Sequence, residues 1–391
     1  MKLQVLEVGQ LREAAFVDRP NRFVVRCRQG ARTVEAFLPN PGRLWELLLP
    51  GARLWLADRA KAKALTAGSD AAKHRFIVVA VERDGRPVLL HTHWTNRVAR
   101  VLLEQRLIPG LEAFEVVRAE VRRGGSRFDF LLRRDKLQEA LLEVKSCTLF
   151  GNRVAMFPDA VTERGRRHLQ ELATLSEKAG GVKPTVLFLV HTPEVDWFMP
   201  DFHTDLAFGQ TLLEVKERVK IVAVSLDWQP DLSVALPVRR LQVPWTFLQK
   251  EMADRGAYLL ILELQQTVSQ TVGRLGELTF QPGFYIYVGS ARRQLSARVA
   301  RHCRRRKRFH WHIDYLRDVA CSCTPLPIRS SRQDECALAE ALSQIFSSGP
   351  LGFGCSDCSC PTHLFYSRRP PLQQAEFHKL LQHFRMRPPS T

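Results

Sequence analysis

Long apolar runs are missing from this sequence. No stretch approaches the ~18 consecutive apolar residues that a membrane-spanning helix needs, which argues against a helical membrane protein. The first residues, MKLQVLEVGQLRE, carry an acid at Glu7 and lack the apolar core of a secretory signal peptide. No basic stretch has a clear apolar face, which disfavours attachment to a membrane surface. We therefore expect a soluble cytoplasmic protein without a membrane partner.

Acidic residues are scarce relative to basic ones. The 391 residues include 40 Asp and Glu against 58 Lys and Arg, which gives a formal net charge of +18 and a pI near 10.0. Such a surplus favours a polyanionic partner, and nucleic acid is the partner we expect. The length is enough for two or three domains with a sizeable core.

Tyrosine and cysteine are scarce before residue 258. The earliest tyrosine is Tyr258, and only two of the nine cysteines, Cys27 and Cys147, precede it. This shift indicates two modules, and the segment QPDLSVALPVRRLQVPW, with its three prolines, predicts a linker at residues 231–253. An odd number of unevenly spread cysteines fits reduced thiols or a metal site better than a disulfide framework.

The first 90 residues contain short strand-like runs bounded by turn sequences, namely 23–27, 33–37, 52–56 and 76–81. Closely spaced strands predict a small barrel of the OB kind over residues 1–90, a fold that often binds oligonucleotides. Arg43 follows the turn Asn40-Pro41-Gly42 and is a candidate phosphate contact, although a plain turn also explains this segment. Basic residues between Lys61 and Arg75 predict a loop that is either solvated or in contact with phosphate.

Two apolar runs after residue 125 carry three residues with the chemistry of a nuclease. Asp129 lies in Phe128–Leu132, and Glu143 and Lys145 lie in or beside Ala140–Val144. The charged connection predicts a β-hairpin, in which residues two apart share a face. Two carboxylates can hold Mg²⁺, and a lysine can position or deprotonate the attacking water. We predict Asp129, Glu143 and Lys145 as catalytic residues, with the two acids as metal ligands; a surface ion pair is the alternative.

Basic residues lie on both sides of this hairpin. A helix is predicted to open at Thr95 or Asn96, and a second one follows residue 157, with leucines on one face and cations on the other. Cations beside a nuclease site would hold the phosphate backbone. The candidate nucleic-acid contacts of this region are Arg97, Arg127, Arg164, Arg166, Arg167 and His168. Buried strand-like runs at 185–190 and 221–226 complete an α/β domain with a mixed sheet over residues 91–230.

Five stretches of the first module form a recognisable set: NPGRL (40–44), TNRV (95–98), GSRFDF (125–130), LEVKSCTL (142–149) and the long FPDAVTERGRRHLQEL (157–172). With them, residues 8 to 230 resemble the sugar fermentation stimulation protein family. The resemblance implies DNA binding, an OB-like domain and a PD-(D/E)xK nuclease-type domain, in which Asp129, Glu143 and Lys145 take the nuclease positions and Glu120 is a further candidate acid. The family is described by DNA binding more than by catalysis, so hydrolysis is an inference from the residues. A tighter basic segment is usual after the first domain, which leaves the role of residues 61–75 open.

The second module carries GAYLLILEL (256–264), GFYIYVGSA (283–291), HWHIDYL (310–316) and CSDCSCPTHLFY (355–366). Over residues 254–368 these resemble the DUF123-type branch of the GIY-YIG nuclease superfamily, with GAY in place of GIY. The resemblance implies a small α/β fold in which Tyr258 and Tyr287 flank the scissile phosphate and Arg298 stabilises it. A helix glutamate, Glu335 in preference to Glu340, would hold a metal ion. A tyrosine can accept a proton only if a cation lowers its pKa from ~10; an inactive fold kept for binding is the alternative.

The densest run of cations in the chain spans residues 301–308. Arg304, Arg305 and Arg306 are candidate nucleic-acid contacts, because aromatic residues that can stack on bases follow at once. His310 and His312 are phosphate contacts, metal ligands or structural residues. We expect residues 369–391 to form a basic C-terminal tail.

The cysteine-rich segment near the end has residue types that suit a metal. Cys355, Cys358, Cys360 and His363 are compatible with Zn²⁺. The paired C-x-x-C layout is absent, so the sequence favours reduced thiols over a zinc site, since free cysteine is usually a small core residue.

The predicted architecture is α/β with β: an OB-like barrel, a PD-(D/E)xK-like α/β domain and a GIY-YIG-like α/β domain. The predicted function is that of a DNA-binding protein of the sugar fermentation stimulation type with Mg²⁺-dependent endonuclease activity. The alternative is a non-catalytic DNA-binding or regulatory protein with nuclease-like folds.

Overall fold

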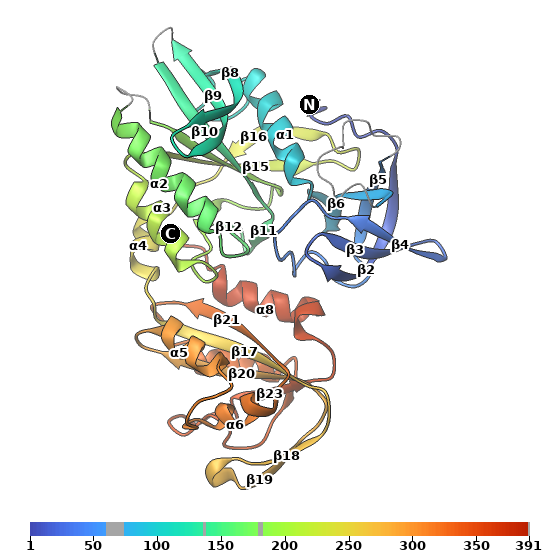
Figure 1. Cartoon of the computed structure of the whole chain (residues 1–391), viewed down its shortest axis with the longest axis vertical. Coiled ribbons are helices and arrows are strands. Elements are labelled where there is room, and N and C mark those ends of the chain that lie inside the picture. The colour runs from blue at the N-terminus through green and yellow to red at the C-terminus, as the bar shows by residue number, and fades with distance from the viewer. Residues whose placement is uncertain (60–73, 136–137, 179–182, 390–391) are drawn as a thin grey trace. The chain divides into compact units, whose positions relative to one another are not determined.

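The computed structural model describes residues 1–59, 74–135, 138–178 and 183–389. The chain forms two compact units (Figure 1). The first consists of Met1–Asp201, Ala207–Trp245 and Pro388–Thr391, and the second of Phe202–Leu206 and Thr246–Arg387. Most of the predicted basic loop after Lys61 lies outside the described residues. At its end Arg75 pairs with Asp58 at 2.9 Å.

A closed barrel begins the first unit. Its strands are β2 (Leu11–Asn21), β3 (Val24–Gln29), β4 (Arg32–Phe37), β5 (Arg53–Asp58) and β6 (Phe76–Arg83), with β7 (Arg86–Leu89) added beside β6. Neighbouring strands are antiparallel except β4 and β6, whose parallel pairing of Ala36 with Phe76 closes the barrel. Alternate side chains such as Phe16, Val25 and Leu54 fill the inside. The predicted OB-like barrel is confirmed.

A seven-stranded mixed sheet forms the rest of the first unit. Its order is β1 (Lys2–Leu3), β16 (Val234–Arg240), β15 (Lys220–Trp228), β13 (Thr185–Val190), β10 (Gln138–Cys147), β9 (Ser126–Asp135) and β8 (Glu115–Arg123). The central strands β10, β13 and β15 are parallel and the outer pairs are antiparallel. A small sheet of β11 (Leu149–Gly151), β12 (Val154–Phe157) and β14 (Trp197–Pro200) adjoins it. The expected mixed α/β sheet is present.

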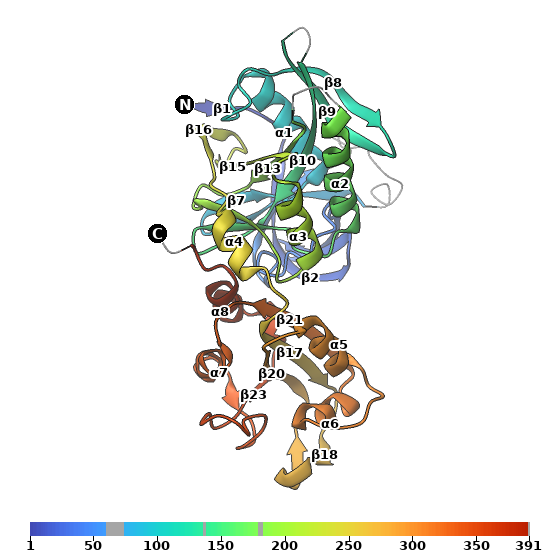
Figure 2. The same ribbon diagram turned by 90° about the vertical axis from the view of Figure 1, so that its left-hand side faces the viewer.

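Helices cover both faces of this sheet because its central strands are apolar on both sides. Val186 and Phe188 pack with residues of α2 (Glu163–Lys178) and α3 (Leu206–Val215). Leu187 packs with residues of α1 (Thr92–Glu104) on the other face. Figure 2 shows α2 and α3 side by side across the strands.

Two of the motif stretches meet inside the first unit. The backbone N–H of Leu44 donates to Oδ2 of Asp159 at 3.3 Å, and a Cβ on Gly42 would lie 2.3 Å from the same oxygen. Arg19 donates to the carbonyls of Gly42 and Arg43 at 2.7 Å each. The NPGRL turn is therefore a fixed contact between barrel and sheet domain, and position 42 has room only for glycine.

The predicted linker at residues 231–253 is wrong for most of its length. It contains β16, which pairs with β15 and β1, and α4 (Trp245–Glu251). Buried Val234 and Val238 give this segment a core-facing side that its prolines obscured. The two units divide after Trp245.

The second unit is built on an antiparallel sheet. Its order is β21 (Ser322–Arg329), β17 (Gly256–Leu264), β20 (Gly283–Ala291), β23 (Leu364–Ser367) and β22 (Ser347–Ser348), and a hairpin of β18 (Val268–Thr271) and β19 (Glu277–Phe280) extends from it. On one face Leu260 and Leu262 pack with residues of α5 (Leu295–Cys303) and α6 (His312–Val319). Helix α7 (Glu335–Ser343) contacts β20 and β23, and α8 (Ala375–Arg385) contacts β21.

The expected basic C-terminal tail is also wrong for most of its length. Residues 375–385 form α8, and Phe377, Leu381 and Phe384 on it are buried. Their spacing of four and three residues is that of an amphipathic helix, which the basic residues between them mask. Within the described residues, no helix is long and apolar enough to cross a membrane.

Candidate functional site

Asp129 and Glu143 lie where two strands of the large sheet separate. The ladder between β9 and β10 ends at the pair Phe130 and Leu142, of which Phe130 directly follows Asp129 and Leu142 directly precedes Glu143. Beyond that point the carboxylate of Asp129 takes the place of a backbone partner, because its Oδ2 accepts the N–H of Val144 at 2.7 Å. The strand geometry therefore brings the two predicted acids to one end of the hairpin.

Helix α1 supplies a second contact to this aspartate. Nδ2 of Asn96 donates to Oδ1 of Asp129 at 2.7 Å. The helix starts at Thr92 rather than at Asn96, so Asn96 lies one turn inside it and does not cap it. Asn96, predicted as a possible first residue of this helix, thus holds the orientation of a candidate metal ligand.

Glu143 is almost fully buried between the side chains of Lys145 and His168. Nζ of Lys145 lies 2.5 Å and Nδ1 of His168 2.6 Å from its Oε1. The other oxygen, Oε2, is buried and has no hydrogen-bond partner among the described residues. The prediction that Glu143 and Lys145 share a strand face is confirmed by their contact.

The pKa values of the two acids shift in opposite directions. Burial raises the pKa of Asp129, and the neighbouring charge of Glu143 adds to this. Burial also acts to raise the pKa of Glu143, but the hydrogen bonds from His168 and Lys145 outweigh it and lower the pKa below its usual value. Two carboxylates held together with one free buried oxygen are a donor set that fits a hard divalent cation.

His168 is not on the cationic face of α2, where the sequence placed it. Its side chain is buried, contacts Glu143 and packs edge-to-face against Phe128 at a centroid distance of 5.8 Å. Its Nε2 faces Nε of Arg164 at 3.4 Å. The leucine spacing carries the signal for this orientation, because position 168 lies four residues before buried Leu172 and shares its face.

The other basic residues predicted around this site lie at the surface. Arg97, Arg127, Arg164 and Arg167 are exposed, and Arg166 is half-buried. Arg127 pairs with Glu120 at 3.3 Å, so Glu120 is engaged on the exposed side of β8. Arg43 is half-buried, and its guanidinium lies over the ring of Trp45 at 4.8 Å from the centroid.

In the second unit, Tyr258 and Tyr287 lie on adjacent strands, with ring centroids 6.4 Å apart. Tyr258 is paired with Gly289, and a Cβ at position 289 would lie 2.4 Å from the Tyr258 hydroxyl oxygen. The glycine of the tyrosine-x-glycine motif therefore makes room for the ring of the first tyrosine.

Burial raises the pKa of both phenols well above the usual value, and the nearby Arg298 offsets this only in part. A tyrosine can accept a proton only if a nearby cation lowers its pKa. The charged residues of the protein do not lower the pKa of either tyrosine below its usual value, so both hydroxyls stay protonated near neutral pH. Arg298 is exposed, donates to the carbonyl of Ser290 at 3.1 Å and lies 5.3 Å from the ring of Trp311.

His302 was not predicted from the sequence as a site residue. It lies one turn after Arg298 on α5, buried, with ring centroids 5.7 Å from Tyr258 and 6.4 Å from Tyr287. Its Nδ1 is 3.4 Å from the buried carboxylate of Asp314. The four-residue spacing to Arg298 was the available signal, because residues at i and i+4 share a helix face.

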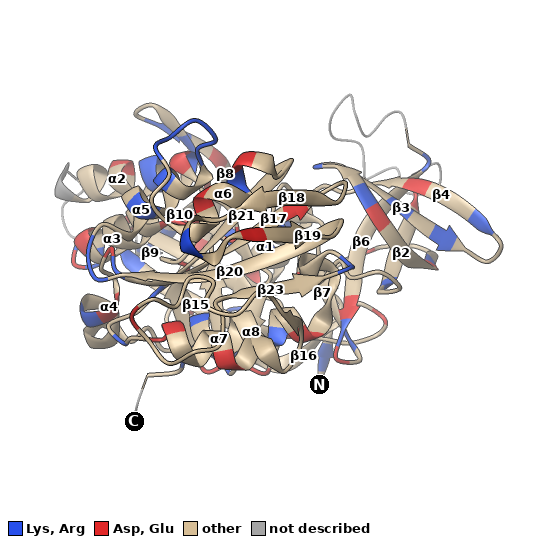
Figure 3. Ribbon diagram, turned by 90° about the horizontal axis from the view of Figure 1, so that it is seen from below, with Lys and Arg blue, Asp and Glu red and all other residues tan. Residues whose placement is uncertain are grey.

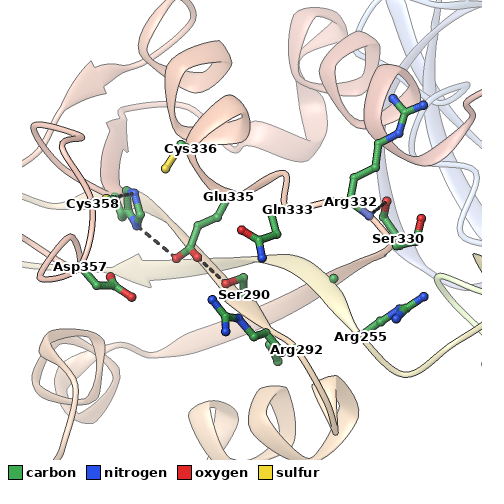
Figure 4. Close-up of a pocket in the computed structure, with 14 residues that line it drawn as sticks. Arg255, Ser290, Arg292, Ser330, Arg332, Gln333, Glu335, Cys336, Asp357 and Cys358 are labelled. Carbon is green, nitrogen blue, oxygen red and sulfur yellow. Dashed lines mark hydrogen bonds and ion pairs between the residues drawn. The ribbon is translucent and has the colours of Figure 1, made fainter.

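Glu335 lies in a pocket of about 460 Å³ that Arg255, Arg292 and Arg332 also line. Oε2 accepts the hydroxyl of Ser290, and Oε1 lies 3.3 Å from Nδ1 of His363. Figure 4 shows the carboxylate of Glu335 pointing toward Ser290. Glu340 is exposed and absent from the pocket lining, so the preference for Glu335 agrees with the geometry.

The cationic run 301–308 divides into inward and outward side chains. Helix α5 ends at Cys303, and Arg301 and Lys307 bind the buried Asp314 at 3.1 and 2.9 Å. Arg304, Arg305 and Arg306 are exposed on the loop that follows, the blue stretch between α5 and α6 in Figure 3.

The two candidate histidines that follow this run differ in their surroundings. His312 accepts the N–H of Gly354 at 3.1 Å, a structural role, while His310 stays exposed.

The comparisons with known proteins divide the chain in the same order. Residues 17–90 match the SfsA N-terminal OB domain, residues 93–232 the sugar fermentation stimulation protein RE domain, and residues 257–386 a domain of unknown function, DUF123. A sugar fermentation stimulation protein homolog of Methanosphaera stadtmanae is 35% identical over 222 residues, 56% of this chain and 89% of that protein. The homolog of Chloroflexus aurantiacus is 40% identical over 204 residues, 52% of this chain and 74% of that protein.

A solved structure supports the same assignment for the first unit. The structure of Pyrococcus furiosus SfsA in complex with Ca²⁺ is similar with a TM-score of 0.54 and 31% identity, over 62% of this chain and 99% of that one. The chain therefore belongs to the sugar fermentation stimulation protein family and carries a C-terminal DUF123 domain.

Proposed function

We propose that this chain binds DNA and hydrolyses phosphodiester bonds at Asp129, Glu143 and Lys145 with the help of Mg²⁺. The observation that carries the proposal is the buried Oε2 of Glu143, which has no hydrogen-bond partner among the described residues. Leaving such an oxygen unpaired costs about 1–3 kcal/mol or more for a charged group. A bound cation removes that cost.

The residues around the acids have separable tasks. Asp129 and Glu143 would hold the ion, and Asn96 and His168 fix their orientation. Lys145, 2.5 Å from Glu143, brings a positive charge beside the carboxylate, where it can stabilise a water molecule or a phosphate oxygen. When bound, Mg²⁺ lowers the pKa of a coordinated water and neutralises charge on the phosphate.

The relative from Pyrococcus furiosus supports the choice of a hard cation. Its structure is described as a complex with Ca²⁺, and this chain covers 99% of that protein. Calcium and magnesium both prefer oxygen ligands, although magnesium demands a smaller and more regular site. A pair of carboxylates beside a lysine suits either ion.

DNA binding rests on charge and on where the cations lie. The net charge of +18 favours a polyanion, and exposed Arg97, Arg164 and Arg167 belong to the two helices that reach the acids. In the second unit, three arginines line the Glu335 pocket and others stand on the loop after α5. These exposed arginines favour nucleic-acid binding by the second unit, and burial, which raises the pKa of both tyrosines, disfavours their use as bases in hydrolysis.

A second candidate is a DNA-binding protein without hydrolytic activity. The observation in its favour is that both oxygens of Asp129 already accept a hydrogen bond. On this reading, Asp129 only supports the strand geometry and holds no ion. The two candidates predict the same affinity for DNA and differ in cleavage.

Cleavage of supercoiled and branched DNA, with Mg²⁺ or with EDTA, separates them. We expect the wild type to cleave with Mg²⁺ and Asp129→Ala and Glu143→Gln to lose cleavage at least a hundred-fold while still binding DNA. Glu139→Gln is the matched control, because Glu139 lies on the same strand in an exposed ion pair with Arg133. Tyr287→Phe should cleave like the wild type. No cleavage by the wild type, with DNA binding unchanged in the variants, would leave only the second candidate.

A further inference from the structure

Four metal-binding side chains of the second unit converge on one point. Cys336, Cys358, Cys360 and His363 each direct one ligand atom there, and these atoms all lie within 4.8 Å of one another. We propose that these four residues bind one Zn²⁺ ion.

The spacing fits tetrahedral coordination by three thiolates and an imidazole. Zn–S bonds of ~2.3 Å and a Zn–N bond of ~2.0–2.1 Å imply a sulfur–nitrogen separation of about 3.6 Å. Sγ of Cys358 lies 3.4 Å from Nε2 of His363. Thiolate and imidazole donors select Zn²⁺ over Mg²⁺ or Ca²⁺, which prefer oxygen.

Glu335 lies on the side of the His363 imidazole that faces away from Cys358. Nε2 of His363 faces Cys358, while Nδ1 faces Oε1 of Glu335 at 3.3 Å. A carboxylate on the distal nitrogen is the usual partner of a zinc-bound histidine, since it fixes the tautomer that leaves Nε2 free to coordinate. Ser290 in turn donates to Oε2 of Glu335. This arrangement gives Glu335 a positioning role independent of any part in hydrolysis.

A metal ion here would connect a long loop to a helix. Residues 349–363 form turns and bends without a helix or strand, whereas Cys336 belongs to the first turn of α7. The loop packs on the tyrosine site, because a Cβ on Gly354 would lie 2.7 Å from the Tyr287 ring. An ion shared by α7 and this loop would hold that contact, as structural zinc sites do where a core is small.

The structure changes the ligand set that the sequence suggested. Cys355 lies outside the group, and its thiol faces the carbonyl of Pro361 at 3.6 Å. Cys336 takes its place from a distant part of the chain. The sequence favoured reduced thiols because free cysteines are usually core residues. That reason does not apply to this ligand set, because Cys336 is exposed and Cys358 and Cys360 are only half-buried.

Zinc content and affinity of the full-length protein test this proposal. The reduced protein, freed of metal with a chelator, is titrated with Zn²⁺ against a chromophoric competitor, and with Co²⁺ to read tetrahedral thiolate ligation from its visible spectrum. We expect one Zn²⁺ per chain and an affinity at least ten-fold lower in Cys336→Ser and Cys358→Ser. Cys355→Ser, from the same loop, should bind like the wild type.

Two results would overturn the proposal. One is a wild-type protein that takes up neither Zn²⁺ nor Co²⁺ at these thiols. The other is a Cys336→Ser variant that keeps wild-type affinity while Cys355→Ser loses it, which would restore the set read from the sequence. Circular dichroism of the metal-free proteins shows that each variant is folded, and the exposed position of Cys336 favours this.

Discussion

Nδ1 of His168 lies 2.6 Å from Oε1 of Glu143, although the two residues are far apart in the chain and belong to a helix and a strand. Both side chains are buried, with exposed fractions of 3% for His168 and 4% for Glu143. A buried carboxylate needs such a partner, because its desolvation would otherwise favour the protonated form. The contact therefore keeps Glu143 ionised and available to a cation.

Replacing His168 tests this contact. In His168→Ala, Glu143 keeps only Lys145, so its pKa rises and the free energy of unfolding falls by about 1–3 kcal/mol. Urea denaturation near neutral pH measures the loss. Arg167→Ala is the control, because Arg167 is exposed on the same helix and should change stability by less than about 0.5 kcal/mol. Equal effects of the two substitutions would contradict the assigned role.

The glycine opposite Tyr258 gives a second prediction. In Gly289→Ala the new Cβ would lie 2.4 Å from the Tyr258 hydroxyl oxygen, so the ring must leave its place. We expect a loss of about 1–3 kcal/mol in the stability of the second unit. Thermal denaturation measures it. Gly125→Ala is the control, because its Cβ would meet only a flexible glutamate at 3.4 Å. A Gly289→Ala variant as stable as this control would contradict the close packing of Tyr258.

Asp159 predicts how stability changes with pH. Burial, together with the charge of Glu46, raises the pKa of Asp159 from 3.8 to about 6. The folded protein therefore binds this proton more tightly than the unfolded chain, and the contribution of the neutral carboxyl is complete below pH 3.8 and lost as the pH rises through 6. Between pH 4 and 7, wild-type stability should fall relative to Asp159→Asn by up to about 3 kcal/mol.

Denaturation of both proteins at several pH values measures this difference. Asp84→Asn is a suitable control, because Asp84 is exposed and its replacement should change stability by less than about 0.5 kcal/mol at each pH. A difference between Asp159→Asn and wild type that stays constant from pH 4 to 7 would show that Asp159 is not perturbed.

The loop after α5 predicts the salt dependence of DNA binding. Arg304 and Arg306 are exposed, and each phosphate contact adds ~0.9 to the slope of log affinity against log salt. The double variant Arg304→Ala/Arg306→Ala should reduce that slope by about 2. Fluorescence anisotropy at several salt concentrations measures it. Lys379→Ala, an exposed change on α8, should leave the slope nearly unchanged, and an equal effect would mean that net charge alone acts.

Glu335 and Glu340 allow a matched test of the zinc environment. Glu335→Gln removes the carboxylate beside Nδ1 of His363 and should weaken Zn²⁺ binding roughly 10–100-fold. Glu340→Gln, on the same helix but exposed, should not. The competitor titration measures both. Equal affinities would leave Glu335 without a role at the metal.

Local patterns were enough to predict part of this molecule. The hairpin that joins Asp129 to Glu143 and Lys145 follows from strand periodicity, and the barrel follows from short runs and turns. Composition gave the wrong prediction where it disagreed with the periodicity of apolar residues. Prolines obscured the buried side of β16, and basic residues obscured that of α8. His168 was assigned by its charge, although the helical repeat places it with Leu172.

Contacts between distant segments were beyond the sequence. Cys336 joins Cys358 and Cys360 only because α7 and the loop before β23 meet in the folded unit. The pairing of Asp159 with Leu44 is of the same kind, since it joins a loop of the sheet domain to a turn of the barrel. Spacing along the sequence does not predict these pairs, because they form only when whole helices, strands and loops pack together.

A divalent cation held by Asp129 and Glu143 can be located directly. Crystals of the full-length protein grown with Mn²⁺, which replaces Mg²⁺ at oxygen sites, allow anomalous scattering to locate it. We expect a peak within coordination distance of both Asp129 and Oε2 of Glu143, and its loss in Asp129→Ala. Ordered side chains with no peak between them at saturating Mn²⁺ would show that the two acids hold no cation.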